Sequence, residues 1–249
     1  MKIGVVGLGL IGGSIFKDLT ILGFDVVGVS KSQNGTNIYK SYDILKECNL
    51  VFVCTPMNKT LAVLDELENI LPKDTTVTDV CSLKRFVSNK KYSFNFIPSH
   101  PMAGTENKGF ENSIEGLFKG AKWVITSENP SNVLTDIIKQ LGATPVFTTP
   151  EEHDRAVSLV SHMPMLISQA IFKNVQDDKL ALEIASSGFR DMTRLALSNP
   201  EMANDMITIN SDNIEQALLK LYKNIGELIK ENYKDQIEQI KEKRKTMFL

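Results

Sequence analysis

Short apolar runs alternate with amphipathic stretches through the first 150 residues of the chain. Seven runs rich in β-branched and aromatic residues have the length of strands, and they span residues 3–6, 25–29, 50–54, 75–78, 94–97, 122–126 and 144–147. The segments between these runs carry apolar residues at helical spacing. Strands that alternate with helices are typical of a mostly parallel sheet with helices on both faces. We therefore predict a doubly wound α/β domain over residues 1–150.

The strand pattern stops at Pro150, and residues 151–249 carry apolar positions at helical spacing as far as Lys245. Within this half, Asn199 and Pro200 are residue types preferred at the N-cap and the first position of a helix, so we expect a helix to begin there. The change of pattern predicts an all-α C-terminal domain.

The last helical segment has an apolar stripe at near-heptad spacing. Its members are Ile214, Leu218, Leu221, Ile225 and Leu228, followed by Tyr233, Ile237 and Ile240. A stripe of this kind has to be covered, and packing within the chain and a dimer seam explain it equally well. The stripe alone does not decide between the two. If the chain has a protein partner, we expect it to be a second copy that forms a homodimer through the helical domain.

The charges of the chain nearly cancel, with 28 basic against 30 acidic residues and a net charge of −2. Bulk electrostatics therefore gives no reason to expect a nucleic-acid or membrane partner. No segment approaches the ~20 apolar residues of a membrane span, and the N-terminus lacks the cleavage site of a signal peptide. The cysteines Cys48, Cys54 and Cys81 have no CxxC spacing, which favours buried thiols over a disulfide or a zinc site. We expect a cytoplasmic protein that acts on a small molecule.

A glycine-rich turn follows the first predicted strand. The stretch VVGLGLIGGS has the pattern GxGxxG at Gly7, Gly9 and Gly12, and Leu10 and Ile11 open the helix that we predict over residues 10–22. In this context the glycines allow a tight turn, a close approach of a pyrophosphate to the backbone, and close packing of helix on strand. The α/β domain is therefore predicted to be of the Rossmann type and to bind a dinucleotide.

The end of the second strand bears on which dinucleotide binds. An NAD site usually has Asp or Glu about 20 residues past the glycines, to hold the ribose 2′-hydroxyl. This chain has Ser30 there, followed by Lys31 and Ser32. The absence of a carboxylate removes repulsion of a 2′-phosphate, while the lysine adds a cation and the serines add hydroxyl donors. We predict a preference for NADP; the alternative is that Lys31 is a surface lysine and NAD is accepted.

One of the three histidines lies at the end of a predicted strand. His100 is in SHPMAGTE, directly after the run 94–97. Ligands in open α/β sheets bind at the carboxyl ends of strands. The loop with Thr55 and Pro56, the loop TDVCSLK and the loop with His100 should therefore meet in one crevice with the dinucleotide. An imidazole has a pKa near working pH and can take a proton as hydride leaves for a nicotinamide ring, so we predict that His100 is catalytic.

Four motifs in this order, GLGLIGGS, SHPMAGTE, HDRAVSLVSHMPM and GFRDMTR, resemble the prephenate and arogenate dehydrogenases of tyrosine biosynthesis. The resemblance covers residues 2 to about 210 and is weakest over the last forty. It implies oxidative decarboxylation of a cyclohexadienyl substrate, with hydride transfer to NAD or NADP. It further implies that His100 hydrogen-bonds the ring hydroxyl and accepts its proton, while Ser82 orients the imidazole or the hydroxyl.

The resemblance also implies which side chains bind the substrate. GFRDMTR has Arg190 and Arg194 four residues apart, so on a helix they share a face. The family pattern matches Arg194 to an arginine that binds a substrate carboxylate, and Arg190 stands where a basic residue often assists. The alternative for Arg194 is an ion pair with Asp191 or another surface carboxylate.

Four further residues complete the predicted substrate site: Ser161, His162, Thr105 and Glu106. The first two lie in SHMPM, where the family often has Ser-His-x-Pro-His, so Met165 replaces a second histidine. The other two are predicted to close the pocket, with helix capping as the alternative. A second departure is Ala203, where relatives often have tryptophan. We interpret His153, in EEHDR, as a structural or helix-starting residue.

Two rival functions share parts of this pattern. A β-hydroxyacid or imine reductase combines a Rossmann domain with helices, but it needs a lysine base, and no suitable motif stands out near Lys173 or Lys179. A nucleotide-sensing regulator would keep the fold without the chemistry, and its mark would be loss of His100 or Arg194. Both residues are present.

Overall fold

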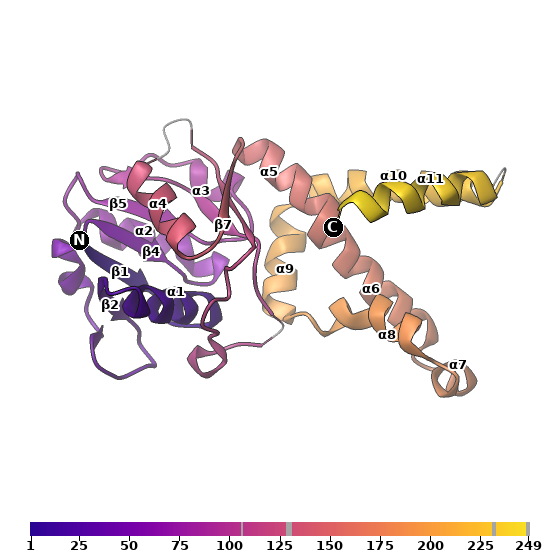
Figure 1. The fold of residues 1–249 in the computed structure, drawn as a ribbon, viewed down its shortest axis with the longest axis horizontal. Coiled ribbons are helices and arrows are strands. Elements are labelled where there is room, and N and C mark those ends of the chain that lie inside the picture. Colours follow the sequence, from indigo (N-terminus) through magenta and orange to yellow (C-terminus); the bar gives the residue numbers. More distant parts are fainter. Residues whose placement is uncertain (106, 128–130, 231–232, 248–249) are drawn as a thin grey trace.

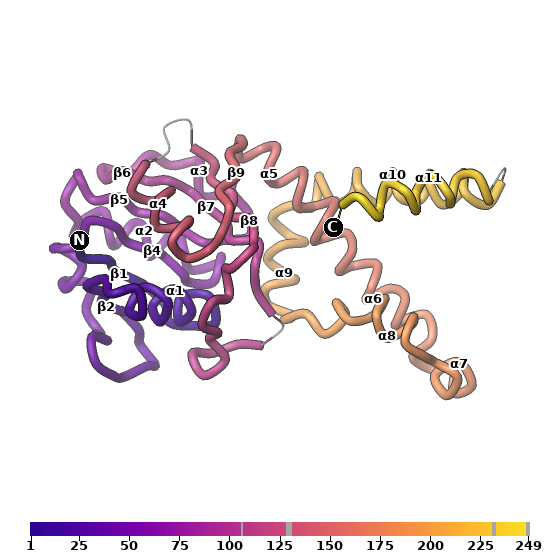
Figure 2. Tube along the Cα trace, viewed as in Figure 1, coloured from indigo at the N-terminus to yellow at the C-terminus, as the bar shows by residue number. Residues whose placement is uncertain are grey.

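The computed structural model describes residues 1–105, 107–127, 131–230 and 233–247, which form two halves: the α/β half predicted to bind a dinucleotide (the nucleotide-binding half) and a helical half (Figure 1 and Figure 2). The elements of the first half are β1 (Lys2–Val6), α1 (Leu10–Ile21), β2 (Asp25–Val29), β3 (Ile38–Tyr39), η1 (Tyr42–Glu47), β4 (Leu50–Val53), α2 (Met57–Glu68), β5 (Thr76–Asp79), α3 (Arg85–Ser88), β6 (Asn95–Phe96), β7 (Ser99–Pro101), η2 (Phe110–Asn112), β8 (Lys122–Ile125), α4 (Asn132–Gln140) and β9 (Thr144–Phe147). The predicted strands and the first helix are present, with ends that differ by one or two residues. The two-residue strand β3 was not predicted.

The main sheet has six strands, all parallel, in the order β3-β2-β1-β4-β5-β6. Its central strands β1 and β4 are buried on both faces, which is why their sequences are continuous apolar runs. From β1 the strands β2 and β3 are added on one side and β4, β5 and β6 on the other. The connections therefore run to opposite sides at β1 and β4, and folds of this kind have a crevice at the carboxyl ends of these two strands. This confirms the Rossmann-type fold.

A second, three-stranded sheet contains the strand with His100. Strand β7 pairs antiparallel with β8, where His100 lies opposite Val124, and β8 pairs parallel with β9. The prediction that His100 lies in a loop after a single strand 94–97 is therefore wrong in detail. The run ends at β6, and Pro98, which has no N–H to continue a ladder, separates it from β7. His100 is thus held by a strand.

The start of β7 is fixed by buried polar contacts. The Ser99 hydroxyl accepts a hydrogen bond from Trp123 Nε1 (2.9 Å) and lies 2.8 Å from Thr78 Oγ1. The Lys84 ammonium is fully buried, pairs with the Asp79 carboxylate, and donates to the Ser99 carbonyl at 2.6 Å. These contacts fix the backbone next to His100 on the end of β5.

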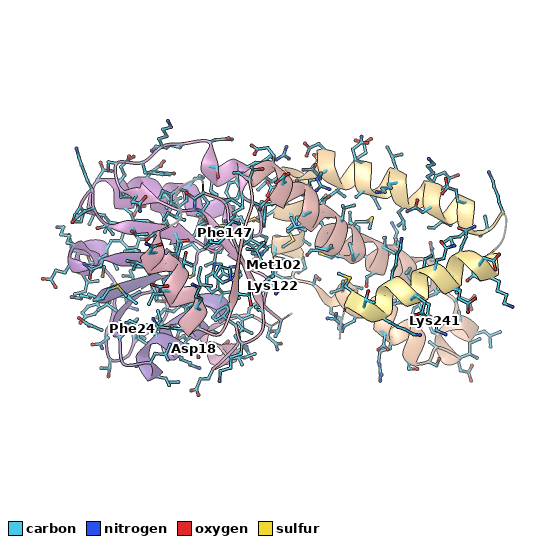
Figure 3. All side chains as sticks on the ribbon, turned by 45° about the horizontal axis from the view of Figure 1, so that its top comes forward. Asp18, Phe24, Met102, Lys122, Phe147 and Lys241 are labelled. Carbon is cyan, nitrogen blue, oxygen red and sulfur yellow. The ribbon has the colours of Figure 1, made fainter. Side chains whose placement is uncertain are left out.

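The helical half begins at Pro150 and contains α5 (Pro150–Val157), η3 (Ser158–His162), α6 (Met163–Val175), α7 (Lys179–Glu183), α8 (Ser187–Thr193), η4 (Arg194–Leu197), α9 (Pro200–Ile209), α10 (Ser211–Leu228) and α11 (Tyr233–Met247). The predicted helix start is confirmed, because α9 begins at Pro200 and the Asn199 side chain accepts hydrogen bonds from two N–H groups of its first turn. The segment η3 is a π-helix, which periodicity did not predict. Figure 3 shows α11, where Lys241 is labelled, far from the nucleotide-binding half marked by Phe24.

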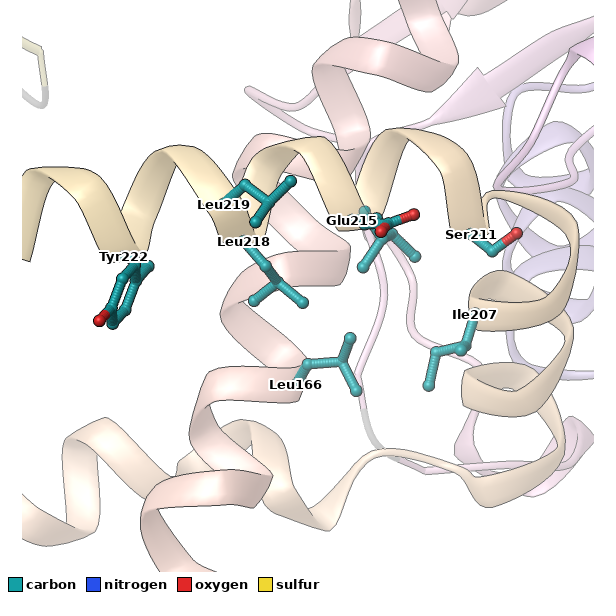
Figure 4. A pocket seen from close by; sticks show the side chains of 8 residues that line it. Leu166, Ile207, Ser211, Glu215, Leu218, Leu219 and Tyr222 are labelled. Atoms are coloured by element: carbon teal, nitrogen blue, oxygen red, sulfur yellow. The ribbon is translucent and has the colours of Figure 1, made fainter.

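The apolar stripe of α10 is covered only at its beginning. Ile214 is 3% exposed, whereas Ile225 is 48% exposed, and in α11 Tyr233 and Ile240 are exposed as well. The covered end adjoins an open groove between α10, α6 and α9 (Figure 4). The groove is lined by Leu166, Ile207, Ser211, Ile214, Glu215, Leu218, Leu219 and Tyr222. One chain therefore leaves most of the stripe open to the surroundings.

The three thiols are free in the structure. Burial raises the pKa of Cys48 to about 11 and raises that of Cys81 further, so both are neutral thiols near pH 7. Among the described helices none has the length and apolarity that would let it cross a bilayer.

The buried pair Lys84–Asp79 predicts a large stability effect. We expect Lys84→Ala to lower the free energy of unfolding by ~3–5 kcal/mol, because the Asp79 carboxylate would stay buried without its cation. Denaturant unfolding measures the change. The matched control is Lys90→Ala, which breaks an exposed pair with Asp65 and should leave the unfolding midpoint close to that of the parent. Equal midpoints for the two variants would contradict the assignment of Lys84 as an anchor.

Candidate active site

The glycine turn after β1 has the geometry of a dinucleotide loop. Gly7 has a positive φ of 88°, and a Cβ there would lie 2.7 Å from the Cys54 carbonyl oxygen. A Cβ on Gly12 would overlap the Gly7 carbonyl, so helix α1 approaches the turn closely. A Cβ on Gly9 would meet nothing within 4 Å. Two glycines therefore serve close packing, and the third keeps the space above the turn open.

The open space lies at the N-terminus of α1. Gly9 is its N-cap and provides no side-chain hydrogen bond to the first turn, which contains Leu10 and Ile11. Free N–H groups and the positive end of the helix dipole are suited to a diphosphate. The residues present therefore fit the diphosphate of a nicotinamide dinucleotide.

The end of β2 carries the three residues predicted to select the dinucleotide. Ser30 is buried, and its hydroxyl accepts a hydrogen bond from Gln33 N at 3.1 Å, which leaves its own O–H free to donate. Lys31 and Ser32 are exposed. The Lys40 ammonium lies 3.2 Å from the Lys31 carbonyl and adds a second cation to this loop. Position 30 is a serine, so this position provides no carboxylate for the ribose 2′-hydroxyl.

The next loop along the sheet contains Thr55 and Pro56. Pro56 is the N-cap of α2, and Thr55 Oγ1 lies 3.0 Å from Thr60 Oγ1. The Thr60 hydroxyl also lies 3.2 Å from Cys81 Sγ, so this loop is fixed to the one that follows β5. Thr55 and Pro56 therefore border the crevice in which the dinucleotide is predicted to bind.

His100 is one end of a chain of hydrogen-bonded side chains. Its Nδ1 lies 3.0 Å from Nε2 of His153, and Nδ1 of His153 lies 2.8 Å from Oδ1 of Asp154. The imidazole of His100 is partly buried on β7, whereas His153 and Asp154 are buried on α5. Burial, with His153, Lys84 and His162 nearby, lowers the pKa of His100 well below 6.5. Near pH 7 this imidazole is neutral and can accept a proton.

Asp154 receives hydrogen bonds from both halves of the chain. Its carboxylate accepts from the backbone N–H groups of Lys84 (2.8 Å) and Arg85 (3.0 Å), which lie at the start of α3. Burial alone would raise the pKa of Asp154, but the hydrogen bonds from His153, Arg85 and Lys84 hold it below its ordinary value. Asp154 is therefore an ionised acceptor at the junction of the halves.

His162 lies close to this chain of side chains. The Asn210 amide nitrogen donates to the Asp154 carbonyl (2.8 Å) and lies 3.3 Å from His162 Nδ1, while its oxygen accepts from Asn213 and Arg85. The amide orientation makes His162 Nδ1 an acceptor, so the proton is on Nε2. That Nε2 is buried and has no partner among the described residues. Burial lowers the pKa of His162 to about 4, so it offers a neutral N–H donor.

The chain matches two models of one protein family. Residues 26–146 match the nucleotide-binding domain of prephenate dehydrogenase, and residues 149–246 match its dimerization domain. The chain belongs to the prephenate dehydrogenase family. The two matched segments lie in the two halves of the fold, and His100 and His153, which face each other, come one from each segment.

Individual relatives agree with this family over most of the chain. Prephenate dehydrogenase of Bacillus subtilis is 30% identical over 84% of the chain, which spans 64% of that relative's length. The crystal structure of Synechocystis arogenate dehydrogenase is 31% identical, with 99% of each chain covered and a TM-score of 0.84. Prephenate dehydrogenase from A. aeolicus, solved with hydroxyphenyl propionate and NAD+, is 25% identical, with coverage of 99% and 98% and a TM-score of 0.85. A β-hydroxyacid or imine reductase thereby loses its support as a rival.

Within this dehydrogenase fold, the predicted substrate residues are only partly brought together. Ser161 and His162 lie in the π-helix η3, and His162 reaches the His100 cluster. π-Turns within helices occur frequently at functional sites. Ser82 lies between β5 and α3 and makes no hydrogen bond with His100 among the described residues, so its predicted role stays a prediction. Thr105 is exposed and its hydroxyl accepts from Asn107 N, and Glu106 lies outside the described residues.

The two arginines lie elsewhere in the single chain. Arg190 is in α8 and Arg194 begins η4, so the predicted common helical face is interrupted by a change of helix type. Both side chains are exposed, and Arg190, not Arg194, pairs with Asp191 at 3.6 Å. Figure 1 shows α8 beside α6, away from β7 and the nucleotide-binding half. Among the described residues, Arg194 makes no hydrogen bond or ion pair with His100 or its partners His153 and Asp154.

Two departures from the family pattern are buried. Met165 is 4% exposed in α6, and Ala203 is 5% exposed in α9. Neither supplies a polar atom, so both positions are apolar parts of the helical packing in this chain.

Sequence reasoning missed the partners of His100. We interpreted His153 as structural, and Asp154 and Lys84 were not singled out. The sequence signal for these partners was the adjacent pair His153 and Asp154 at the start of HDRAVSLVSHMPM. In that motif the substrate role was assigned to the second histidine, His162. His100 and His153 are 53 residues apart, and no periodicity joins a strand to a helix over such a distance.

The glycine turn predicts opposite effects for two matched substitutions. Gly12→Ala should lower the stability of the protein without ligand by ~1–3 kcal/mol, because its Cβ overlaps backbone that cannot move away. Gly9→Ala should leave that stability unchanged and weaken dinucleotide binding about tenfold or more, since the Cβ enters the space above the turn. Thermal unfolding and titration with NAD and NADP separate the effects. Unchanged affinity in Gly9→Ala would remove this turn from the dinucleotide site.

Proposed function

We propose that the chain catalyses the oxidative decarboxylation of a cyclohexadienyl acid, prephenate or arogenate, with a nicotinamide dinucleotide as the hydride acceptor. Residues 1–150 bind the dinucleotide, and residues 151–249 supply substrate groups and the contact with a second copy. The observation that carries the proposal is the neutral imidazole of His100, fixed on β7 and hydrogen-bonded to His153 of the helical half, in a chain of the prephenate dehydrogenase family.

The bond changes define what the side chains must do. The ring carbon that bears the hydroxyl loses hydride to the nicotinamide, the hydroxyl loses a proton, and the ring carboxylate leaves as carbon dioxide while the ring becomes aromatic. The electron pair of the broken C–C bond leaves the ring oxygen as a phenolate, and return of the proton gives 4-hydroxyphenylpyruvate from prephenate or tyrosine from arogenate. The protein has to accept one proton and bind the remaining charged groups of the substrate.

His100 is suited to accept that proton. Its pKa lies well below 6.5 because the ring is buried near cationic and imidazole neighbours, so the neutral form predominates at pH 7. A group with a lowered pKa keeps its lone pair as the pH falls toward that pKa and loses it below. The rate in the free enzyme should therefore hold to pH values below the ordinary titration of histidine.

The remaining groups bind the substrate. His162 presents a buried N–H that has no partner among the described residues and can donate to a substrate oxygen, and Ser161 precedes it in η3. Thr105 and Glu106 belong to the segment after β7 that we propose closes the pocket. Arg194 is exposed and has no hydrogen bond to His100 within the described part of one chain, and the family model names the helical segment a dimerization domain. These observations support a homodimer in which Arg194 of the partner subunit binds a substrate carboxylate, with Arg190 of the partner subunit beside it.

We propose NADP as the preferred dinucleotide. Ser30 brings no carboxylate to repel a 2′-phosphate, and the exposed ammonium groups of Lys31 and Lys40 lie in the loop that follows. Hydroxyl donors at Ser30 and Ser32 add neutral contacts.

The direct test is the rate of nicotinamide reduction with prephenate and with arogenate, each with NAD and with NADP. We expect turnover with one acid or both, and a higher kcat/KM with NADP than with NAD. A tenfold preference for NAD would contradict the NADP assignment alone. The absence of turnover with all four pairs would remove the proposed reaction.

The same assay on His100→Asn tests the base. We expect kcat to fall by about 10²- to 10⁴-fold, because the substituted amide cannot accept the hydroxyl proton. Titration with dinucleotide is the control, and its affinity should stay at the parent value because His100 is not part of the glycine turn. Retention of most of the turnover would exclude His100 as the base.

Mixed dimers test the shared site. His100→Asn and Arg194→Ala should each be nearly inactive alone. Co-expressed with two different affinity tags, they form heterodimers in which one site has both native residues, and about a quarter of the parent rate should return over the whole population.

Two outcomes would contradict the shared site. If both residues act within one chain, every site in the heterodimer carries one substitution and no activity returns. If sedimentation of the parent protein shows a monomer at assay concentration, the second copy is not needed. Arg190→Ala paired with Arg194→Ala is the matched control, and it should restore nothing because each site would take both arginines from the same chain and so keep one substitution.

A further inference from the structure

His153 joins the proposed base to a buried charge. Its ring lies between His100 and Asp154, with its two nitrogens 3.0 Å from His100 Nδ1 and 2.8 Å from Asp154 Oδ1. The two imidazoles meet edge to face at 74°. His153 is 2% exposed, so no bulk water competes for these contacts. The order of the hydrogen bonds can therefore be worked out from the groups themselves.

The direction of the chain follows from Asp154. An ionised carboxylate can only accept hydrogen bonds, and the oxygens of Asp154 already accept from the N–H groups of Lys84 and Arg85. A neutral His153 has one ring proton, and that proton must be on Nδ1 to bond the carboxylate. Its Nε2 is then an acceptor.

The same logic fixes His100. Since His153 Nε2 accepts, His100 Nδ1 has to donate, and the single proton of the neutral ring is placed there. Nε2 of His100 keeps its lone pair and makes no hydrogen bond among the described residues. This is the nitrogen left to face a ligand.

We propose that His153 and Asp154 are positioning residues that hold His100 in the tautomer with its proton on Nδ1, so that Nε2 takes the proton of the substrate hydroxyl. This inference rests on the proposed function for the identity of the proton donor, but the tautomer itself does not depend on it. In the step, the O–H bond of the substrate breaks and the Nε2–H bond of His100 forms. The new imidazolium keeps its Nδ1–H on His153, whose own N–H stays on the Asp154 carboxylate.

The assignment goes beyond a structural role for His153. A histidine free of such contacts populates both neutral tautomers, and the one with the proton on Nε2 offers no lone pair to the substrate. The array is fixed from two sides, because α5 carries His153 and Asp154 while the start of α3 and Asn210 bind Asp154. The orientation of the base therefore depends on the junction between the two halves.

The chain is suited to a direct measurement because it has only three histidines. In protein labelled with 15N-histidine, two-bond correlations between the carbon-bound ring protons and the ring nitrogens distinguish protonated from unprotonated nitrogens. The spectrum of His100→Asn identifies the signals of position 100. We expect a protonated Nδ1 and an unprotonated Nε2 for both His100 and His153 at pH 7, without any ligand. A protonated Nε2 on His100, or two ring protons on His153, would overturn the proposal.

Two substitutions at position 153 test the consequence. His153→Leu removes the acceptor, so His100 should show a mixture of tautomers and kcat should fall by about 10- to 100-fold with little change in KM. His153→Gln has an amide oxygen to accept from His100 and an amide N–H for Asp154, so it should restore the tautomer and part of the rate. Arg155→Leu, an exposed change on the same helix, is the control and should alter neither.

The outcomes separate this inference from the proposed function. If no substrate turns over, the spectra of the parent and of the variants still decide the tautomer. If the enzyme is active but His153→Leu keeps both the spectrum of His100 and the parent kcat, His153 has no positioning role. If His153→Leu does not fold, the parent spectrum and His153→Gln remain sufficient to confirm or overturn the proposal.

Discussion

The ionised carboxylate of Asp154 is the constraint on which the rest of the site depends. It is buried at the junction of the two halves, and it is stable there only because four groups bond it: the N–H groups of Lys84 and Arg85, the ring of His153, and the Arg85 side chain at 3.4 Å. Each of these bonds also fixes a part of the active site. The start of α3 holds the end of β5, and His153 holds His100, so one charge couples the sheet, the helices and the proposed base.

Most of the fold could be predicted from the sequence because its signals are local. Buried parallel strands have continuous apolar sequences, and the glycines of the first turn have a fixed spacing. The N-cap residue Asn199 indicates where a helix begins. The parts that were missed depend on distant partners. The three-residue strand β7 exists because it pairs with β8 and because Ser99 is held by Trp123 and Lys84, none of which a run of residues reveals.

The site was predictable to the same extent. The glycine turn and His100 could be proposed as site residues because each follows a recognisable apolar run, and their roles stay predictions. His153 and Asp154 could not be given a role, since a buried hydrogen bond between segments 53 residues apart leaves no period in the sequence. The spacing of Arg190 and Arg194 was misleading for a related reason: it assumes one continuous helix, whereas the chain changes to a 3₁₀ turn at Arg194.

The two halves differ in how complete they are within one chain. The nucleotide-binding half buries its core and carries His100 on a strand, whereas the helical half leaves Ile225 and Tyr222 of α10 largely exposed, and Arg194 is exposed as well. An exposed apolar helix face is typical of a contact surface, and the family model that matches residues 149–246 is named a dimerization domain. Burial of the stripe and completion of the substrate site would then be consequences of the same contact. In the proposed function, the proton acceptor would be fixed within one chain and the substrate carboxylate would be bound by the other, so activity would depend on assembly.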